Sequence, residues 1–184
     1  MPVEPPPGRW LLPDPRGAEP GANVVGAGAD LEPGTLLAAY RAGLFPMPVE
    51  PRRRRSKIAW YSPDPRGIIP LDRFHVPTRL KRTIRADGVT VRVDTAFDAV
   101  LDACAASGPG REDSWINAPI RRLYIELNAR GHAHSIECWR DETLVGGLYG
   151  VTLGGAFFGE SMFSRERDAS KIALVHLVAR LKRG

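Results

Sequence analysis

The stretch Phe157-Phe158-Gly159-Glu160-Ser161-Met162-Phe163-Ser164-Arg165 sets one carboxylate in the middle of an apolar run. Its composition predicts a strand. Because strand residues alternate between faces, Glu160 should share one side with Phe158 and Met162. A charge among apolar groups is costly to bury unless something pairs with it. Glu160 is therefore either a structural carboxylate, at a sheet edge or in an ion pair, or a functional one. Gly159 beside it removes a side chain where a ligand could approach closely.

The segments around this strand predict an α+β domain with a largely antiparallel sheet. Three successive strands are expected, with hairpin turns at Asp141-Glu142 and Gly154-Gly155; they cover residues 134–140, 143–153 and 156–163. A final helix should begin near Asp168. Upstream, Asp94 is a good N-cap for a helix that runs to Ser107. The other expected elements are a basic helix at 78–85, a strand at 89–93 and a helix at 118–130.

The first third of the chain predicts a smaller unit. Residues 1–9 should form an extended or disordered arm, and residues 10–67 a small N-terminal α/β domain, with the main domain at 68–184. A helix is expected at 33–42 and a strand at 58–61, and residues 13–29 should be a loop. The segment Gly43-Leu44-Phe45-Pro46-Met47-Pro48 is too rich in proline to predict regular structure.

Composition narrows the setting of the protein. A net charge of +5 over 184 residues favours a polyanionic partner. Two cysteines exclude a disulfide framework and a four-ligand zinc site, and fit a reduced compartment. No apolar run approaches the roughly 20 residues that span a membrane. We expect a soluble, cytoplasmic monomer that needs no cofactor.

Most of the known catalytic sequence motifs are absent from this chain. There is no G-x-S-x-G elbow or phosphate-binding glycine loop, and nothing completes a metal site at His132 and His134. Arg52-Arg53-Arg54-Arg55 is either a solvated loop or a phosphate contact. Trp115 either fills the core or offers a face on which a base can stack. Glu160 stands as the main polar candidate.

Five colinear stretches carry a resemblance. They are Phe158-Gly159-Glu160-Ser161-Met162-Phe163-Ser164-Arg165 with Ala169-Ser170-Lys171, residues 36–46 (LLAAYRAGLFP), 60–66 (WYSPDPR), 131–137 (GHAHSIE) and 144–151 (LVGGLYGV). Together they resemble the bacterial leucyl/phenylalanyl-tRNA–protein transferases, from about residue 10 onward.

The resemblance implies a small N-terminal domain joined to a domain with a GNAT-related, acetyltransferase-like fold. It implies transfer of Leu, Phe or Met from aminoacyl-tRNA to proteins that begin with Arg or Lys, which marks them for degradation. Glu160 matches the carboxylate that orients the aminoacyl group. Further matches are Trp115, near the 3′-terminal adenosine, and a set lining the amino-acid pocket: Leu148, Gly159, Ser161, Met162 and Leu174.

Two positions depart from the family pattern. Met47 stands where a Trp is common, and Leu177 where a Phe can sit, which predicts weaker contact with the adenosine. Family members also continue past Gly184, through a strand with an Asp-x-Gln pair that is expected to serve the acceptor. The sequence therefore looks C-terminally truncated relative to the family, as a fragment or as a chain without its acceptor half.

Two other functions compete with this reading. The first is a tRNA-binding protein without turnover. The second is an acyl-CoA-dependent N-acyltransferase, for which Arg85-Ala86-Asp87-Gly88 begins the pyrophosphate-binding pattern and Thr90 breaks it.

Overall fold

The computed structural model describes residues 1–50, 56–86, 88–106 and 114–184. These residues form two compact units. The first contains residues 1–67, 105–132 and 153–156, and the second contains residues 68–104, 133–152 and 157–184. Residues 105–132 thus belong to the first unit, beyond the predicted boundary at residue 67; the division into domains stays a prediction.

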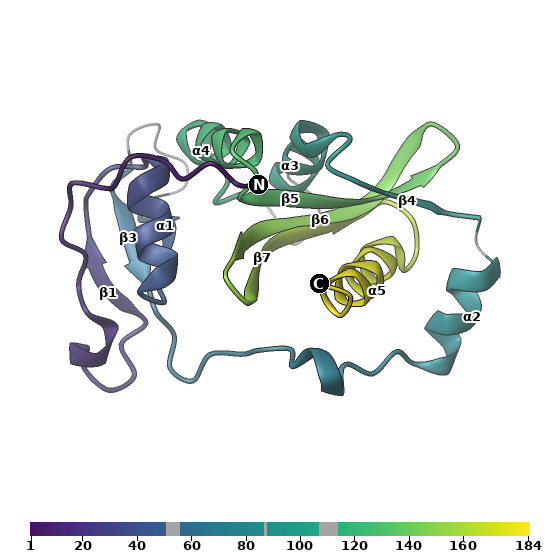
Figure 1. The fold of residues 1–184 in the computed structure, drawn as a ribbon, viewed down its shortest axis with the longest axis horizontal. Coiled ribbons are helices and arrows are strands. Elements are labelled where there is room, and N and C mark those ends of the chain that lie inside the picture. Colours follow the sequence, from purple (N-terminus) through teal and green to yellow (C-terminus); the bar gives the residue numbers. More distant parts are fainter. Residues whose placement is uncertain (51–55, 87, 107–113) are drawn as a thin grey trace. The chain divides into compact units, whose positions relative to one another are not determined.

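The first unit combines a three-stranded antiparallel sheet with two helices (Figure 1). The strands are β1 (Val24–Ala27), β2 (Phe45–Pro48) and β3 (Ile58–Tyr61), in the order β1-β3-β2, and a 3-10 turn, η1 (Pro15–Gly17), precedes them. The helices are α1 (Pro33–Arg41) and α4 (Ala118–Ala129). The hydroxyl groups of Tyr40 on α1 and Tyr124 on α4 lie 2.9 Å apart and join the helices inside the core.

Strand β2 corrects the prediction that residues 43–48 lack regular structure. It is an edge strand, and its register pairs Pro46 with Trp60 and Pro48 with Ile58. The N–H of Val49 donates to Lys57 at 2.9 Å, so odd-numbered residues point their N–H groups at β3. Both prolines therefore occupy alternate positions where no N–H is needed, which an edge strand tolerates.

The predicted loop at residues 13–29 is also wrong in part, because it contains η1 and β1. The β-branched pair Val24-Val25 pairs with β3 despite a register shift between Val24 and Gly26. Residues 1–9 carry neither helix nor strand, and the N–H of Val3 donates to the carbonyl of Arg130 at 2.8 Å.

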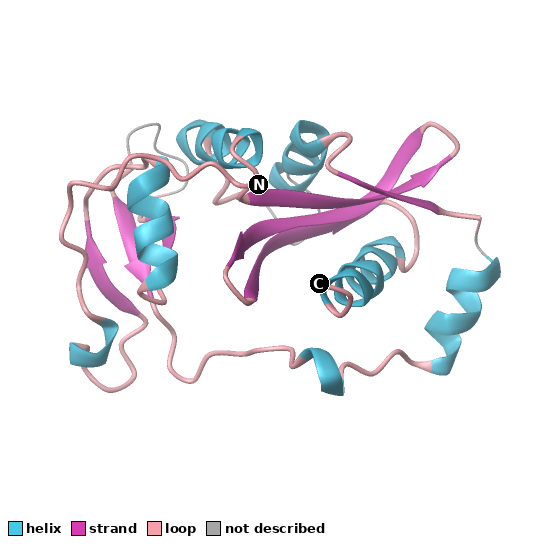
Figure 2. Cartoon of the chain, viewed as in Figure 1, coloured by secondary structure: helices cyan, strands magenta, loops and turns pink. Residues whose placement is uncertain are grey.

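The second unit is an antiparallel four-stranded sheet with helices on both faces (Figure 2). Its strands, in the order β4-β5-β6-β7, are β4 (Thr90–Val93), β5 (Ala133–Arg140), β6 (Thr143–Leu153) and β7 (Ala156–Ser164). The helices are α2 (Thr78–Ala86), α3 (Phe97–Ala105) and α5 (Ala169–Leu181), with a 3-10 turn η2 (Leu71–Arg73) before them. The α+β prediction is confirmed for both sheets.

The two faces of this sheet carry different contacts. The α5 face is an apolar core in which Ile136, Cys138 and Leu148 pack against Ile172 and Ala173. Gly146 lets this helix approach, since a Cβ there would lie 2.4 Å from that of Ala169. On the opposite face Phe97 of α3 contacts Tyr149 edge-on, with ring centroids 6.0 Å apart.

Both predicted hairpin turns are present, with φ of 52° at Asp141 and 57° at Gly154. Among the described residues, no helix is long and apolar enough to cross a membrane.

The N-cap assigned to Asp94 is wrong. Helix α3 begins three residues later, and Asp94 has φ 55°. Its carboxylate instead accepts the N–H of Ser135 at 2.8 Å and lies 2.7 Å from Nδ1 of His134. The buried Glu137 takes over the capping, because it accepts the N–H groups of Thr95 and Ala96.

Candidate active site

Glu160 lies half-buried on β7, at the edge of the four-stranded sheet. Strand β6 ends at Leu153 and β7 begins at Ala156, so the turn has two residues. Counting back along each strand from this turn sets Tyr149 opposite Glu160. The packing of Gly150 agrees, because a Cβ there would lie 2.2 Å from the carbonyl oxygen of Phe158.

Tyr149 is wholly buried beside this carboxylate. Burial raises the pKa of its phenol strongly, and the nearby charges of Glu160 and Cys104 raise it further. The phenol therefore stays protonated at neutral pH and is available as a hydrogen-bond donor. Sequence reasoning missed Tyr149, although the Gly154-Gly155 turn and the strand alternation could have found it.

The backbone beside Glu160 is open. A Cβ added at Gly159 would meet no described atom within 4 Å, and Met162 is 44% exposed. Ser161 is half-buried between them. These three predicted pocket residues therefore lie with Glu160 along one accessible strand, where a ligand could approach.

The predicted leucines lie in the α5 core. Leu148 and Leu177 are 3% and 6% exposed, and Leu174 is partly buried against the same cluster. Because Leu148 and Tyr149 are consecutive in a strand, they point to opposite faces of the sheet. The structure thus separates Leu148 from the side on which Tyr149 contacts Phe97; the roles of all three leucines in binding stay predictions.

Two predicted contacts of the adenosine belong to the first unit. Trp115 is half-buried and meets Tyr124 edge-on, with ring centroids 6.3 Å apart. Met47 is half-buried on β2, opposite Ala59. Arg52, Arg53, Arg54 and Arg55 lie outside the described residues.

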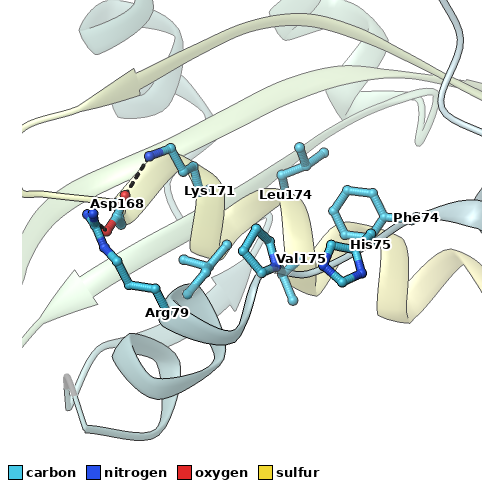
Figure 3. A pocket seen from close by; sticks show the side chains of 9 residues that line it. Phe74, His75, Arg79, Asp168, Lys171, Leu174 and Val175 are labelled. Carbon is cyan, nitrogen blue, oxygen red and sulfur yellow. Dashed lines mark hydrogen bonds and ion pairs between the residues drawn. The ribbon is translucent and has the colours of Figure 1, made fainter.

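A pocket of about 400 Å³ opens between α5 and the segment of α2 with its preceding loop (Figure 3). Phe74 and His75 line one end, together with the predicted residue Leu174. At the other end Asp168 accepts a 2.6 Å hydrogen bond from Lys171, which lowers the pKa of Asp168. Arg79 lies 3.6 Å from the same carboxylate. Sequence reasoning did not foresee this pocket, because its walls come from segments about 90 residues apart.

Comparison with known proteins places these residues in a family. Residues 68–184 match the family described as leucyl/phenylalanyl-tRNA protein transferase, and residues 29–64 match the N-terminal domain of that family. A leucyl/phenylalanyl-tRNA–protein transferase of Phenylobacterium zucineum is 58% identical over 156 residues, which cover 85% of this chain and 70% of that protein. Proteins of the same description from Rhodopseudomonas palustris and Caulobacter vibrioides are 59% and 60% identical, over 86% and 81% of this chain and 68% of each relative.

These matches define an enzyme of the aminoacyltransferase class. The chain belongs to the leucyl/phenylalanyl-tRNA–protein transferase family.

Proposed function

We propose that this chain transfers Leu, Phe or Met from aminoacyl-tRNA to the α-amino group of proteins that begin with Arg or Lys. In the cytoplasm this step would mark those proteins for degradation. The observation that carries the proposal is the half-buried Glu160 on the exposed edge of β7, inside the segment that matches the family.

The transfer reaction requires the two substrates to be positioned correctly, more than it requires either of them to be activated. An aminoacyl ester is already reactive, so the acceptor amine attacks its carbonyl carbon, the new C–N bond forms and the C–O bond to the tRNA breaks. The proton lost by the amine ends on the released 3′-hydroxyl of the tRNA. In this scheme Glu160 binds the amino group of the aminoacyl moiety and fixes its carbonyl for attack.

The donor side chain would lie against the strand and the helix behind it. Gly159, Ser161 and Met162 border the open side of β7, and Leu148 and Leu174 supply apolar surface from the α5 core. Leu177 would contribute from the same core, with Trp115 and Met47 near the adenosine.

The tRNA would bind to basic surface. On α2 the side chains of Arg79, Lys81, Arg82 and Arg85 are all exposed, while Leu80 and Ile84 pack against the core. A helix that is apolar on one side and cationic on the other suits a phosphate backbone. We propose Arg52–Arg55 as further contacts of the tRNA. We also propose a GNAT-related fold for the second unit and a monomeric state.

The test is transfer of labelled Leu from charged tRNA to a peptide with N-terminal Lys. Wild type should transfer, and Glu160→Gln should lower the rate about 100-fold, because the neutral amide loses the charge that holds the amino group. Binding of the tRNA should change little. Glu142→Gln is the matched control, since Glu142 is 87% exposed in the β5–β6 turn.

Two results would reject the proposal. One is wild type that binds charged tRNA without transfer, which would identify a tRNA-binding protein. The other is a Glu160→Gln protein that transfers at the wild-type rate. Circular dichroism of each variant separates loss of chemistry from loss of folding.

A further inference from the structure

We propose that the pocket between α2 and α5 binds one nucleotide of the single-stranded 3′ end of the tRNA. The phosphate of that nucleotide lies at Lys171 and Arg79, and its base lies against Phe74. This inference rests on the proposed function, and it adds a contact that holds the end of the tRNA. Every residue that lines the pocket belongs to the second unit.

The pocket lies on a different side of α5 from the sheet. Helix α5 packs Ile172, Ala173 and Leu177 into the sheet core. Its residues that line the pocket are Asp168, Lys171, Leu174 and Val175. Three of them, at positions 168, 171 and 175, follow the spacing of three and four that marks one side of a helix. The described residues that line the pocket include none from β7, so it is a second site beside Glu160.

One end of the pocket carries a surplus of positive charge. The side chain of Asp168 is 6% exposed, and three cations face its carboxylate. These are Lys171 at 2.6 Å, Arg79 at 3.6 Å and Arg167 at 3.7 Å. The neighbouring carboxylate of Glu166 is already paired with Arg140 at 2.8 Å. Among the described residues, one carboxylate thus balances three cations, and the remaining charge favours an anionic ligand.

The two cations that line the pocket keep hydrogen-bonding capacity for a ligand. The ammonium group of Lys171 has three donors, and one of them is directed at Asp168. The guanidinium of Arg79 lies beyond hydrogen-bond length from that carboxylate, and the Arg79 side chain is 68% exposed. The hydrogen bond from Lys171 lowers the pKa of Asp168, so the carboxylate stays charged at neutral pH and keeps both cations at this end. Oxygens of one phosphate can therefore accept from both side chains.

The other end of the pocket offers flat rings. Phe74 and His75 line it, and Leu174 and Val175 lie between these rings and the cations (Figure 3). Aromatic faces bind nucleic acid bases by stacking. The volume of about 400 Å³ falls within the range of small-molecule sites. A pocket with cations at one end and rings at the other matches a nucleotide, in which a sugar joins a phosphate to a base.

The basic side of α2 leads to this pocket. Arg79, Arg82 and Arg85 are exposed at spacings of three, so they are neighbours on the surface of the helix. Arg79 also lines the pocket, so a phosphate backbone that follows α2 reaches the pocket at that residue. The 3′ end of a tRNA is single-stranded, and unpaired bases can turn out of their stack to enter a protein pocket. This continuity favours a nucleotide of the tRNA over a free anion.

The test compares two uncharged tRNAs, one intact and one that lacks its three 3′-terminal nucleotides. Val175→Trp keeps the charge of the protein, and its indole should occupy the pocket. This variant should bind intact tRNA about tenfold more weakly than wild type, which is within the range for loss of one base contact. It should bind the shortened tRNA as wild type does. Filter binding measures the four affinities.

Lys171→Gln tests the phosphate contact in the same assay. It should reduce the slope of log K against log salt by about 0.7 for intact tRNA, and it should not change the slope for the shortened tRNA. Lys182→Gln is the matched control, because it removes an exposed lysine of α5 that does not line the pocket, and it should change neither slope. If circular dichroism shows that Val175→Trp is unfolded, the two slopes of Lys171→Gln decide the question.

Three results would overturn this inference alone, provided that wild type transfers Leu to the acceptor peptide. The first is an equal effect of either pocket variant on both tRNAs, and the second is no effect on either. The third is an altered preference among leucyl-, phenylalanyl- and methionyl-tRNA with unchanged affinity for uncharged tRNA, which would assign the pocket to the donor side chain. Wild type that neither binds tRNA nor transfers Leu would overturn the proposed function and this inference together.

Discussion

The carboxylate of Glu137 on β5 accepts, at 2.9 Å, the backbone N–H of Thr95, which lies 42 positions earlier in the chain and two residues before the start of α3. Glu137 is 0% exposed, and it also accepts the N–H of Ala96 at 2.8 Å and the hydroxyl of Thr95. A carboxylate facing backbone N–H groups at a helix start is favoured by the helix dipole as well as by the hydrogen bonds. This cap fixes the start of α3, and with it Phe97 against Tyr149.

Replacing Glu137 by Gln should destabilise the protein. Each of its oxygens faces donors only, so the new NH₂ group would oppose an N–H or O–H wherever it pointed. Leaving buried donors unsatisfied in this way should lower the free energy of unfolding by about 2–4 kcal/mol. Urea denaturation followed by circular dichroism measures the change. Glu142→Gln, at an exposed turn, should stay within about 0.5 kcal/mol of wild type, and a similarly small effect of Glu137→Gln would contradict the capping role.

The same region shows what the sequence could and could not predict. The hairpins and the position of Glu160 on its strand follow from local patterns, because turn residues and strand alternation act within a few positions. The family resemblance on residues 158–165 with 169–171, and on four other stretches, is confirmed by the matches at 29–64 and 68–184. Local chemistry was sufficient for these features.

The errors have a common physical origin. Asp is a residue type that is common at N-caps, so the sequence around Asp94 predicted one. In the structure the carboxylate that accepts the N–H of Thr95 is that of Glu137, from a strand that is distant in sequence, and Asp94 accepts the N–H of Ser135 instead. The prolines of β2 are tolerated only because their strand lies at a sheet edge, which requires knowledge of the strand order. Tyr149 is an unremarkable aromatic in the sequence until pairing sets it opposite Glu160. Tertiary pairing, rather than propensity, decided each case.

Asp94 supports a second prediction, on the turn between β4 and α3. The φ of Asp94 is 55°, in the left-handed region. Its carboxylate accepts the N–H of Ser135 and lies within hydrogen-bond distance of Nδ1 of His134. Asp94→Ala loses both contacts and adds backbone strain, so we expect a loss of about 2 kcal/mol in the free energy of unfolding. Asp94→Asn should recover part of that loss, since Asn accepts the N–H of Ser135 and tolerates this conformation. Equal denaturation midpoints for the Ala and Asn proteins would show that the hydrogen bond to the N–H of Ser135 contributes nothing.

The buried phenol of Tyr149 predicts a loss of stability in alkali. In the unfolded chain a tyrosine ionises near pH 10, whereas burial and the charge of Glu160 raise the pKa of Tyr149 in the folded protein. The unfolded state therefore releases a proton that the folded state keeps, so the stability that is present below about pH 10 declines as the pH rises above it. Tyr149→Phe removes this group, and its free energy of unfolding should fall less between pH 9 and 11 than that of wild type. Parallel decline of the two proteins would mean that Tyr149 ionises normally.

The basic side of α2 predicts how tRNA binding depends on salt concentration. Arg82 and Arg85 are exposed on α2, and each phosphate contact that is lost should reduce the slope of log K against log salt by about 0.7–0.9. The Arg82→Ala/Arg85→Ala protein should thus bind tRNA more weakly at low salt, with a slope about 1.5 smaller if both residues contact phosphate. Replacing Arg52–Arg55 with Ala should flatten the slope further.

Arg16→Ala serves as the control. Because Arg16 already pairs with Asp14 at 2.8 Å, this substitution should leave the slope unchanged. Filter binding from 50 to 300 mM salt measures all four proteins, and a slope for the α2 variant equal to that of wild type would remove α2 from the proposed tRNA surface.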